Sequence, residues 1–121
     1  MLILIESSFD KVTALASKLT ESPLALISLI EPHRQFIKSG VGLPEPVATQ
    51  REVPIEYSFC QHVVMLGEAL VIGDTRENAM VCDIPSIQEF NILAYLGIPL
   101  VTADGWNLGS LCIMDTEPRQ W

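Results

Sequence analysis

The sequence predicts an α+β fold with a central antiparallel sheet of about five strands. Two pairs of consecutive apolar segments have the length of strands and are separated by short turns, which is typical of antiparallel hairpins. The predicted order is helix, two strands, long connection, helix, strand, helical loop and two strands, so helices are available to cover one sheet. With 121 residues, of which 49% are hydrophobic, the chain is long enough for one compact domain, residues 1–121, and too short for two.

The first predicted element is a helix that runs to about Thr20, where Pro23 prevents its extension. Its apolar residues recur at helical spacing. They are Phe9, Val12, Leu15, Ala16 and Leu19. We expect this helix to cover one face of the sheet with that apolar stripe.

Two strands follow the first helix. Residues 24–30, LALISLI, are almost continuously apolar, which favours a central strand covered on both faces. EPHR is a turn, and RQFIKSGVG, residues 34–42, is the returning strand of a hairpin. The next segment, to residue 54, carries three prolines in a polar setting, so we expect a connection without regular structure.

The second half begins with a short helix over residues 59–66. Ser58 and Gln61 have the spacing of a capping box, and Gly67 stands where a left-handed helix stop belongs. ALVIG is predicted to be a buried strand, and residues 74–90 a loop with one or two helical turns. Two further strands, LAYLGIPLV and LGSLCIMD, are joined by an Asp-Gly hairpin turn in TADGWN.

Composition excludes several functions. The net charge is −8, and the seven Lys and Arg residues are scattered, so no nucleic-acid partner is expected. The N-terminal apolar run MLILI is too short for a signal peptide or a membrane span, and we expect a soluble, cytoplasmic protein. The three cysteines lack the spacing of a metal site, so we expect reduced thiols and no metal.

Cys60 and His62 are close in sequence but do not form a local dyad. In a helix their side chains differ by about 200° around the axis and point to nearly opposite sides. A partly buried His62 with one hydrogen bond is favoured over a His62 that contacts a ligand. Cys60 is explained as a small apolar residue in the packing, and Cys112 is expected to belong to the core. Cys82 is expected to be the most exposed thiol, either an ordinary loop cysteine or a redox-sensitive one.

A carboxylate at Asp74 is expected to cap a turn. No catalytic constellation is found, so we expect no enzyme.

Several segments together resemble a GAF domain of bacterial sensor histidine kinases, diguanylate cyclases and related signalling proteins. They are FDKVTALASKL, LALISLIEPHRQFIKSGVGLPE, SFCQHVV, ALVIGDT and IPLVTADGWNLGSLCIMDTEPRQW. The resemblance implies terminal helices on one face of the sheet, and a small-molecule pocket formed by loops and short helices on the other. The pocket residues that it implies are Phe59, His62, Asp74, Cys82, Phe90 and Tyr95. Family members normally continue into a long C-terminal helix, so this chain is expected to be a fragment without that helix.

The resemblance also implies a function. A ligand in the pocket would regulate an output domain, such as a histidine kinase or a diguanylate cyclase, elsewhere in the full-length protein. One alternative is a structural dimerisation module whose pocket is filled by its own side chains. Another is a cysteine-dependent free methionine sulfoxide reductase. The ligand or cofactor is not identified by the sequence, no covalent bilin is expected, and a homodimer through the face covered by the first helix is expected.

Overall fold

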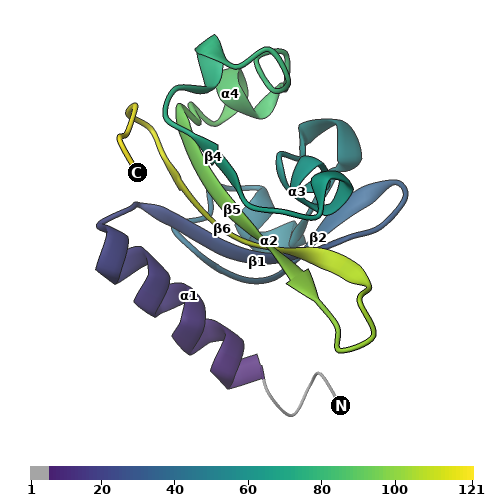
Figure 1. Cartoon of the computed structure of the whole chain (residues 1–121). Coiled ribbons are helices and arrows are strands. Elements are labelled where there is room, and N and C mark those ends of the chain that lie inside the picture. Colours follow the sequence, from purple (N-terminus) through teal and green to yellow (C-terminus); the bar gives the residue numbers. More distant parts are fainter. Residues whose placement is uncertain (1–5) are drawn as a thin grey trace.

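The computed structural model describes residues 6–121, and the MLILI segment lies outside the described residues. Figure 1 shows the elements in chain order. They are α1 (Glu6–Thr20), β1 (Leu24–Ile30), β2 (Arg34–Val41), α2 (Val47–Gln50), β3 (Glu52–Pro54), the 3₁₀ helix η2 (Ile55–Tyr57), α3 (Cys60–Leu66), β4 (Leu70–Ile72), the 3₁₀ helix η3 (Thr75–Glu77), α4 (Ser86–Glu89), β5 (Ala94–Val101) and β6 (Asn107–Asp115). Within residues 6–121, none of the helices has the length and apolar character that crossing a membrane requires.

The strands form one antiparallel sheet in the order β3-β2-β1-β6-β5-β4. The prediction that LALISLI is a central strand, in a hairpin next to the final strand, is confirmed, because β1 pairs with both β2 and β6. The sheet has six strands rather than about five. The additional strand is β3, in the segment expected to be irregular. It ends at Pro54, a residue that an edge strand tolerates because no neighbour needs its missing N–H.

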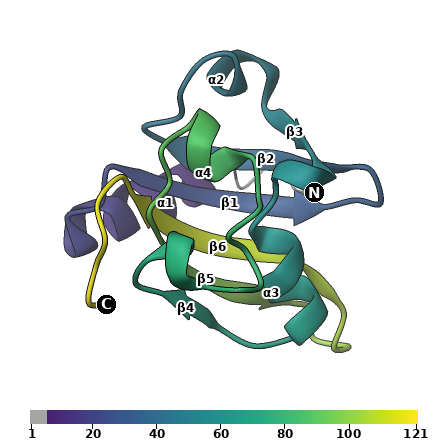
Figure 2. The ribbon, with the colours of Figure 1, turned by 90° about the horizontal axis from the view of Figure 1, so that it is seen from above.

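Helices cover both faces of the sheet. Helix α1 lies on one face, while α3 and α4 lie on the other, and Figure 2 shows α2, α3 and α4 spread above the strands. The main hydrophobic core fills the α3 side, where Leu24 and Leu26 of β1 join side chains from the connecting segments. The alternate β1 residues Ala25 and Ile27 are also buried, on the face toward α1.

Helix α1 does not pack on the sheet with its whole apolar stripe. Thr13 is 1% exposed and its hydroxyl lies 2.9 Å from the Ser39 hydroxyl of β2. Val12, Leu15 and Leu19 are 43%, 55% and 74% exposed. Phe9 and Ala16 of the same stripe are half-buried. The expectation that the whole apolar stripe of this helix covers the sheet is therefore wrong for three of its five residues.

An irregularity in the β1–β2 pairing explains this orientation. Ile27 pairs with Ser39, whereas the next residue, Ser28, pairs with Ile37, so Lys38 is an extra residue in β2. A bulge of this kind reverses the alternation of side chains along the strand. Ser39 consequently faces α1, while Ile37 faces the core.

Gly67 ends α3 as predicted, but only one half of the predicted capping box forms, because the Ser58 N–H donates to the Ile55 carbonyl and not to the Gln61 side chain. Ser58 Oγ accepts a hydrogen bond from the Gln61 N–H at 3.1 Å, and the Gln61 side chain donates to the Ser58 carbonyl at 3.0 Å. Gly67 adopts φ 68° and its N–H donates to the Val63 carbonyl. These contacts satisfy backbone groups that the ends of a helix leave free.

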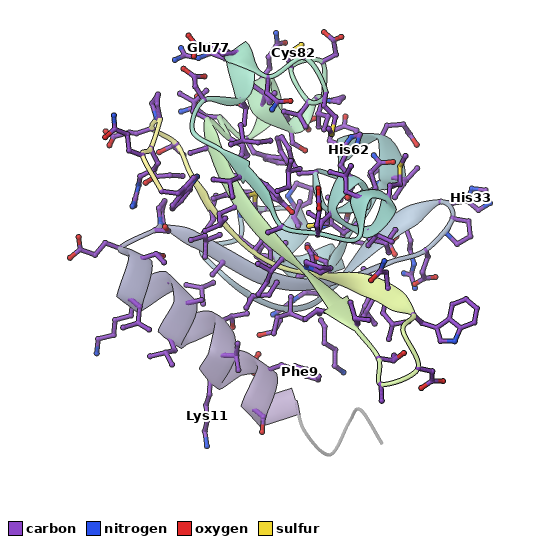
Figure 3. All side chains as sticks on the ribbon, viewed as in Figure 1. Phe9, Lys11, His33, His62, Glu77 and Cys82 are labelled. Atoms are coloured by element: carbon purple, nitrogen blue, oxygen red, sulfur yellow. The ribbon has the colours of Figure 1, made fainter. Side chains whose placement is uncertain are left out.

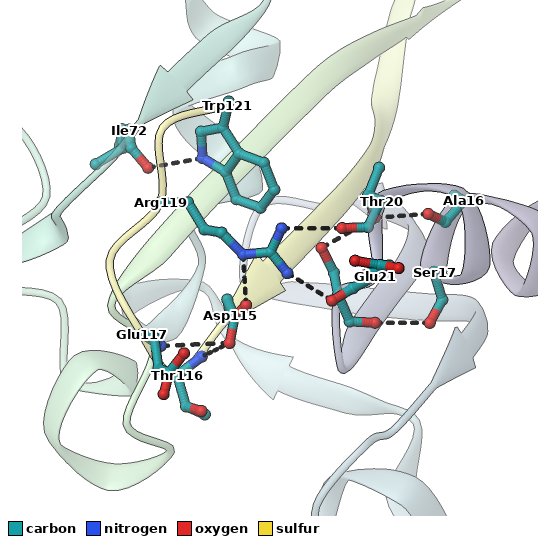
Figure 4. Close-up of polar contacts among 11 residues, drawn as sticks. Ala16, Ser17, Thr20, Glu21, Ile72, Asp115, Thr116, Glu117, Arg119 and Trp121 are labelled. Carbon is teal, nitrogen blue, oxygen red and sulfur yellow. Dashed lines mark hydrogen bonds and ion pairs between the residues drawn. The ribbon is translucent and has the colours of Figure 1, made fainter.

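The segment after β6 makes side-chain contacts that connect α1, β4 and β6 (Figure 4). Asp115 Oδ1 accepts hydrogen bonds from the next two backbone N–H groups, while Oδ2 forms an ion pair with Arg119 at 2.6 Å. Arg119 also donates to the carbonyls of Thr20 and Glu21, at the C-terminal end of α1. The Trp121 indole donates to the Ile72 carbonyl of β4 at 3.0 Å. The end of α1 and the edge of the sheet are thus held by one short segment.

Candidate ligand cavity

A cavity of about 60 Å³ lies on the α3 side of the sheet. Its floor consists of side chains from β1, β2 and β5, and its walls come from α2, the start of α3 and the α4 region. Apolar members of the lining include Leu24, Leu26, Ile37, Leu43, Val47 and Met114. Since most lining side chains are apolar, the cavity favours an apolar or weakly polar occupant.

Two aromatic residues form one wall. Phe59 and Tyr95 stack with ring centroids 5.2 Å apart and an angle of 23° between the rings. The Tyr95 ring lies against Gly97 of the same strand. A Cβ added to Gly97 would stand 2.4 Å from the Tyr95 phenol oxygen. The absence of a side chain at Gly97 is what allows Tyr95 to lie flat beneath the cavity.

A few polar groups reach the lining. Gln35 donates from Nε2 to the Ser28 hydroxyl at 2.7 Å, and Ser86 donates to the Tyr57 carbonyl at 2.6 Å. Gln35, Ser86 and Tyr95 all belong to the lining, and none of the described lining residues is acidic or basic in type (Asp, Glu, Lys, Arg or His). An ion entering this cavity would lose its hydration without gaining an opposite charge, which is costly.

Beneath the cavity lies a buried cluster of two thiols and a phenol. The Sγ atoms of Cys60 and Cys112 are 3.7 Å apart, and the Tyr95 hydroxyl donates to Cys60 Sγ at 3.2 Å. Hydrogen bonding with Cys112 lowers the pKa of Cys60 to about 7, against the opposing effect of burial. The same contact and burial raise the pKa of Cys112, and burial raises that of Tyr95. The contact between the two thiols therefore favours loss of one proton from the pair and opposes loss of the second.

Three of the six candidate residues line the cavity. Phe59 and Tyr95 form its aromatic wall, and Phe90, which is half-buried, contributes from the end of α4. The family resemblance named these three residues together, and the structure brings them around one cavity. No ligand-binding role follows from the position alone.

The other three candidates lie outside this lining. His62 is half-buried on α3, and burial lowers its pKa. Asp74 caps η3, accepting from the Arg76 N–H and forming an ion pair with the Arg76 side chain. Cys82 is exposed, at the periphery of the loop between η3 and α4 (Figure 3).

Asp74 instead borders an open groove between β4 and the C-terminal segment. This groove has a volume of about 530 Å³, and its lining includes Glu77 and Arg119. It is larger than the cavity but open to solvent, so a small molecule there would stay largely hydrated. The enclosed apolar cavity is the better candidate site.

Sequence reasoning missed the floor of the cavity. Gln35 and Ile37 of β2 belong to the floor. Val47 of α2 belongs to a wall that was also missed, because the segment containing it was expected to be irregular. The sequence did carry one signal for Gln35. It is a polar residue at a core position of a strand that pairs with an apolar central strand, and such a residue is a candidate for the lining of a site. Among residues 6–121, no group of three or more potential metal ligands comes together.

Comparison with known proteins identifies the family. The family model for the GAF domain matches residues 5–121, and the chain therefore belongs to the GAF domain family. A cyclic di-GMP phosphodiesterase of Pseudomonas aeruginosa is 36% identical over 112 residues, which cover 92% of this chain and 18% of that protein.

Solved structures share the fold at low sequence identity. The NreA protein of Staphylococcus aureus, mutated in its nitrate-binding site, matches with a TM-score of 0.74 and 16% identity, covering 100% of this chain and 94% of that one. A type II free methionine-R-sulfoxide reductase from Thermoplasma acidophilum matches with a TM-score of 0.74 and 12% identity, covering 98% and 79%. At these identities the matches establish the fold and nothing further.

Proposed function

We propose that this GAF domain is a regulatory module that binds a small, neutral molecule in the cavity beneath α2, α3 and α4. The observation that carries the proposal is a partly enclosed, mainly apolar cavity. A few residues with polar atoms belong to its lining: Gln35, Tyr57, Cys60, Ser86 and Tyr95. Few polar groups among many apolar ones are typical of sites that orient a small ligand. The proposed role requires binding and no catalysis.

Size and charge restrict the proposed ligand. A volume of about 60 Å³ has room for about four water molecules, well below the several hundred Å³ of a typical drug-sized site. A nucleotide is too large for it in this form, and an anion such as nitrate has no cationic partner in the lining. The ligand class that fits is a small neutral solute with one or two hydrogen-bonding groups.

The proposed output lies in a longer protein. This chain spans 18% of the length of its phosphodiesterase relative, as expected for a sensory module attached to other domains. By analogy with that relative, we propose an output domain of nucleotide or two-component signalling in the cytoplasm. The contacts of Arg119 with the end of α1 provide a physical link between the sheet and the first helix.

A homodimer is proposed to form through the outer face of α1. Val12, Leu15 and Leu19 recur at a spacing that places them on one side of the helix, and all three are exposed. A second copy of the chain can cover this stripe by a symmetric contact of two α1 helices, since a two-fold pair buries identical surfaces. The sheet face beside α1 is a second candidate surface, because Val71 of β4 and Ile98 of β5 lie on that face and are 58% and 45% exposed.

The small volume favours a second candidate function. If the side chains around Phe59 and Tyr95 fill the cavity in solution, the domain is a structural dimerisation module without a ligand. The reductase alternative gains no support from exposure, because Cys60 and Cys112 are each 1% exposed.

Methyl NMR of the whole chain separates the first two candidates. The methyl groups of Leu26, Ile37 and Val47 line the cavity and should shift when small neutral probes such as xenon or short alcohols are added. The shifts should disappear in Val47→Phe, which fills the space, and persist in Val101→Phe, a matched change at an exposed site. Unchanged methyl signals with every neutral probe would contradict the ligand proposal and favour the structural one.

A further inference from the structure

We propose that Cys60 and Cys112 form a reversible disulfide when the protein meets hydrogen peroxide, so that the floor of the cavity is a redox modification site. The inference rests on the pair itself and does not depend on the proposed ligand. Two thiols from distant parts of the chain, one at the start of α3 and the other in β6, are brought into contact at 3.7 Å.

The geometry requires little movement. A disulfide has an S–S distance of about 2.05 Å, so the two sulfurs need to approach by less than about 2 Å from their present separation. Cys60 is the first residue of α3, a helix of seven residues, whereas Cys112 is held in the middle of the sheet by β1 and β5. Most of the approach therefore falls to the short helix rather than to the sheet.

The cavity offers a route for the oxidant. Cys60 belongs to its lining, although the residue is 1% exposed to bulk solvent. Hydrogen peroxide is neutral and little larger than water, so a cavity of about 60 Å³ admits it without the cost of burying a charge. A bulkier thiol reagent would be excluded from the same space.

The chemistry proceeds in two balanced steps. The Cys60 thiolate attacks one oxygen of hydrogen peroxide, the O–O bond breaks, and sulfenic acid forms at Cys60 with release of hydroxide. The Cys112 sulfur then attacks the Cys60 sulfur, the S–O bond breaks, and the departing hydroxide takes the Cys112 proton to become water. The hydroxide from the first step takes the proton that Cys60 lost on ionisation and becomes the second water. Overall, two thiols lose two hydrogens, one peroxide is reduced, and two waters are formed.

The surroundings of the pair support this order of events. Tyr95 donates to Cys60 Sγ at 3.2 Å, and a pKa of about 7 for Cys60 supplies the thiolate that the first step needs. The titratable groups that influence Cys60 are Cys112 of β6 and Tyr95 of β5, and the hydroxyls of Ser110 and Ser28 also contribute. The Ser110 hydroxyl is buried beside the pair and helps to lower the pKa of Cys60.

Disulfide formation would change the cavity. Cys60 Sγ would lose its role as acceptor for the Tyr95 hydroxyl, and α3 would move toward β6. Because Phe59 precedes Cys60 and stacks on Tyr95, the aromatic wall would move with the helix. The oxidised and reduced forms would therefore present different cavities.

The test uses the full chain with Cys82→Ser, because Cys82 is exposed and would otherwise react or cross-link. The folded protein is treated with hydrogen peroxide, quenched with catalase, unfolded, alkylated and digested with trypsin without reduction. Arg76 separates Cys60 from Cys112 in sequence, so a linked pair of peptides identifies the disulfide. We expect a loss of two hydrogens from the intact mass, joint loss of alkylation at both cysteines, and full recovery after dithiothreitol.

Two comparisons make the result decisive. In Cys82→Ser/Cys112→Ala, oxidation of Cys60 should stop at sulfenic acid, which is detected as a dimedone adduct. In Cys82→Ser/Cys60→Ala, Cys112 should react with hydrogen peroxide far more slowly. Wild-type protein supplies an internal reference, the exposed Cys82. The proposal is overturned if Cys82 is oxidised while Cys60 and Cys112 remain fully alkylatable, or if the linked peptides appear only when peroxide is added to unfolded protein.

Discussion

The Tyr95 ring occupies the space that a side chain at Gly97 would need. A Cβ at Gly97 would stand 2.4 Å from the Tyr95 hydroxyl and 2.8 Å from two ring carbons, closer than such contacts allow. Gly97→Ala should therefore displace the ring, weaken its hydrogen bond to Cys60 and destabilise the fold by about 1–3 kcal/mol, the usual cost of overpacking. Urea unfolding measures this loss.

A double-mutant cycle shows whether the ring is the cause. In a Tyr95→Leu background the smaller side chain no longer reaches the added methyl, so Gly97→Ala should cost clearly less than in wild type. An equal cost in both backgrounds would mean that strain in the strand, rather than contact with Tyr95, limits this position.

The two sides of α1 should respond differently to substitution. Leu15→Gln with Leu19→Gln alters exposed side chains, so each change should shift stability by no more than about 0.5 kcal/mol while abolishing self-association. Thr13→Val removes the buried hydroxyl bonded to Ser39 and should cost about 1 kcal/mol while leaving association intact. Sedimentation equilibrium at about tens of micromolar, beside urea unfolding, reports both properties. A wild-type chain that stays monomeric there contradicts the proposed dimer.

Arg119 should stabilise the C-terminal end of α1. Arg119→Lys keeps the positive charge but loses the planar group that reaches Asp115 and two carbonyls at once. We expect a loss of about 1–3 kcal/mol and faster amide hydrogen exchange over residues 18–22. The matched change Arg76→Lys, at an exposed arginine paired with Asp74, should have a much smaller effect. Equal effects of the two changes would argue against this role for Arg119.

The half-buried His62 should make stability depend on pH. Burial lowers its folded-state pKa below the ordinary value of 6.5, so the folded protein favours the neutral ring. Between the folded pKa and 6.5 the unfolded chain binds more protons, and stability rises with pH across that interval. The contribution is fully present above pH 6.5 and is lost as pH falls through the folded pKa.

His62→Gln tests this dependence directly. The variant should lose stability less steeply than wild type as the pH falls below 6.5, and the difference between the two proteins should be constant at higher pH. Urea unfolding at a series of pH values measures both curves. Parallel curves over the whole range would show that His62 titrates alike in the folded and unfolded chains.

Local signals in the sequence predicted the local structure well. Ser58 and Gly67 mark the ends of α3, and Gly105 adopts φ 92° in the turn that joins β5 to β6. The near-continuous apolar character of LALISLI identified β1 as a central strand. Each of these signals depends on neighbouring residues alone.

Errors arose where a distant contact decides the outcome. The apolar stripe of α1 was expected to face the sheet, but the extra residue at Lys38 brings Ser39 to that face, and no pattern in α1 reveals it. The same bulge places Ile37 in the floor of the cavity. The contact between Cys60 and Cys112 likewise depends on how α3 lies across β6, which neither segment encodes by itself.

Native mass spectrometry of the whole chain, purified gently from the cell that makes it, tests the proposed ligand site most directly. The account predicts a mass excess equal to one small neutral molecule, lost in Val47→Phe and retained in Val101→Phe. The released molecule should be uncharged and small enough for the cavity. A mass equal to that of the polypeptide alone, unchanged after exposure to native cell extract, would contradict the account.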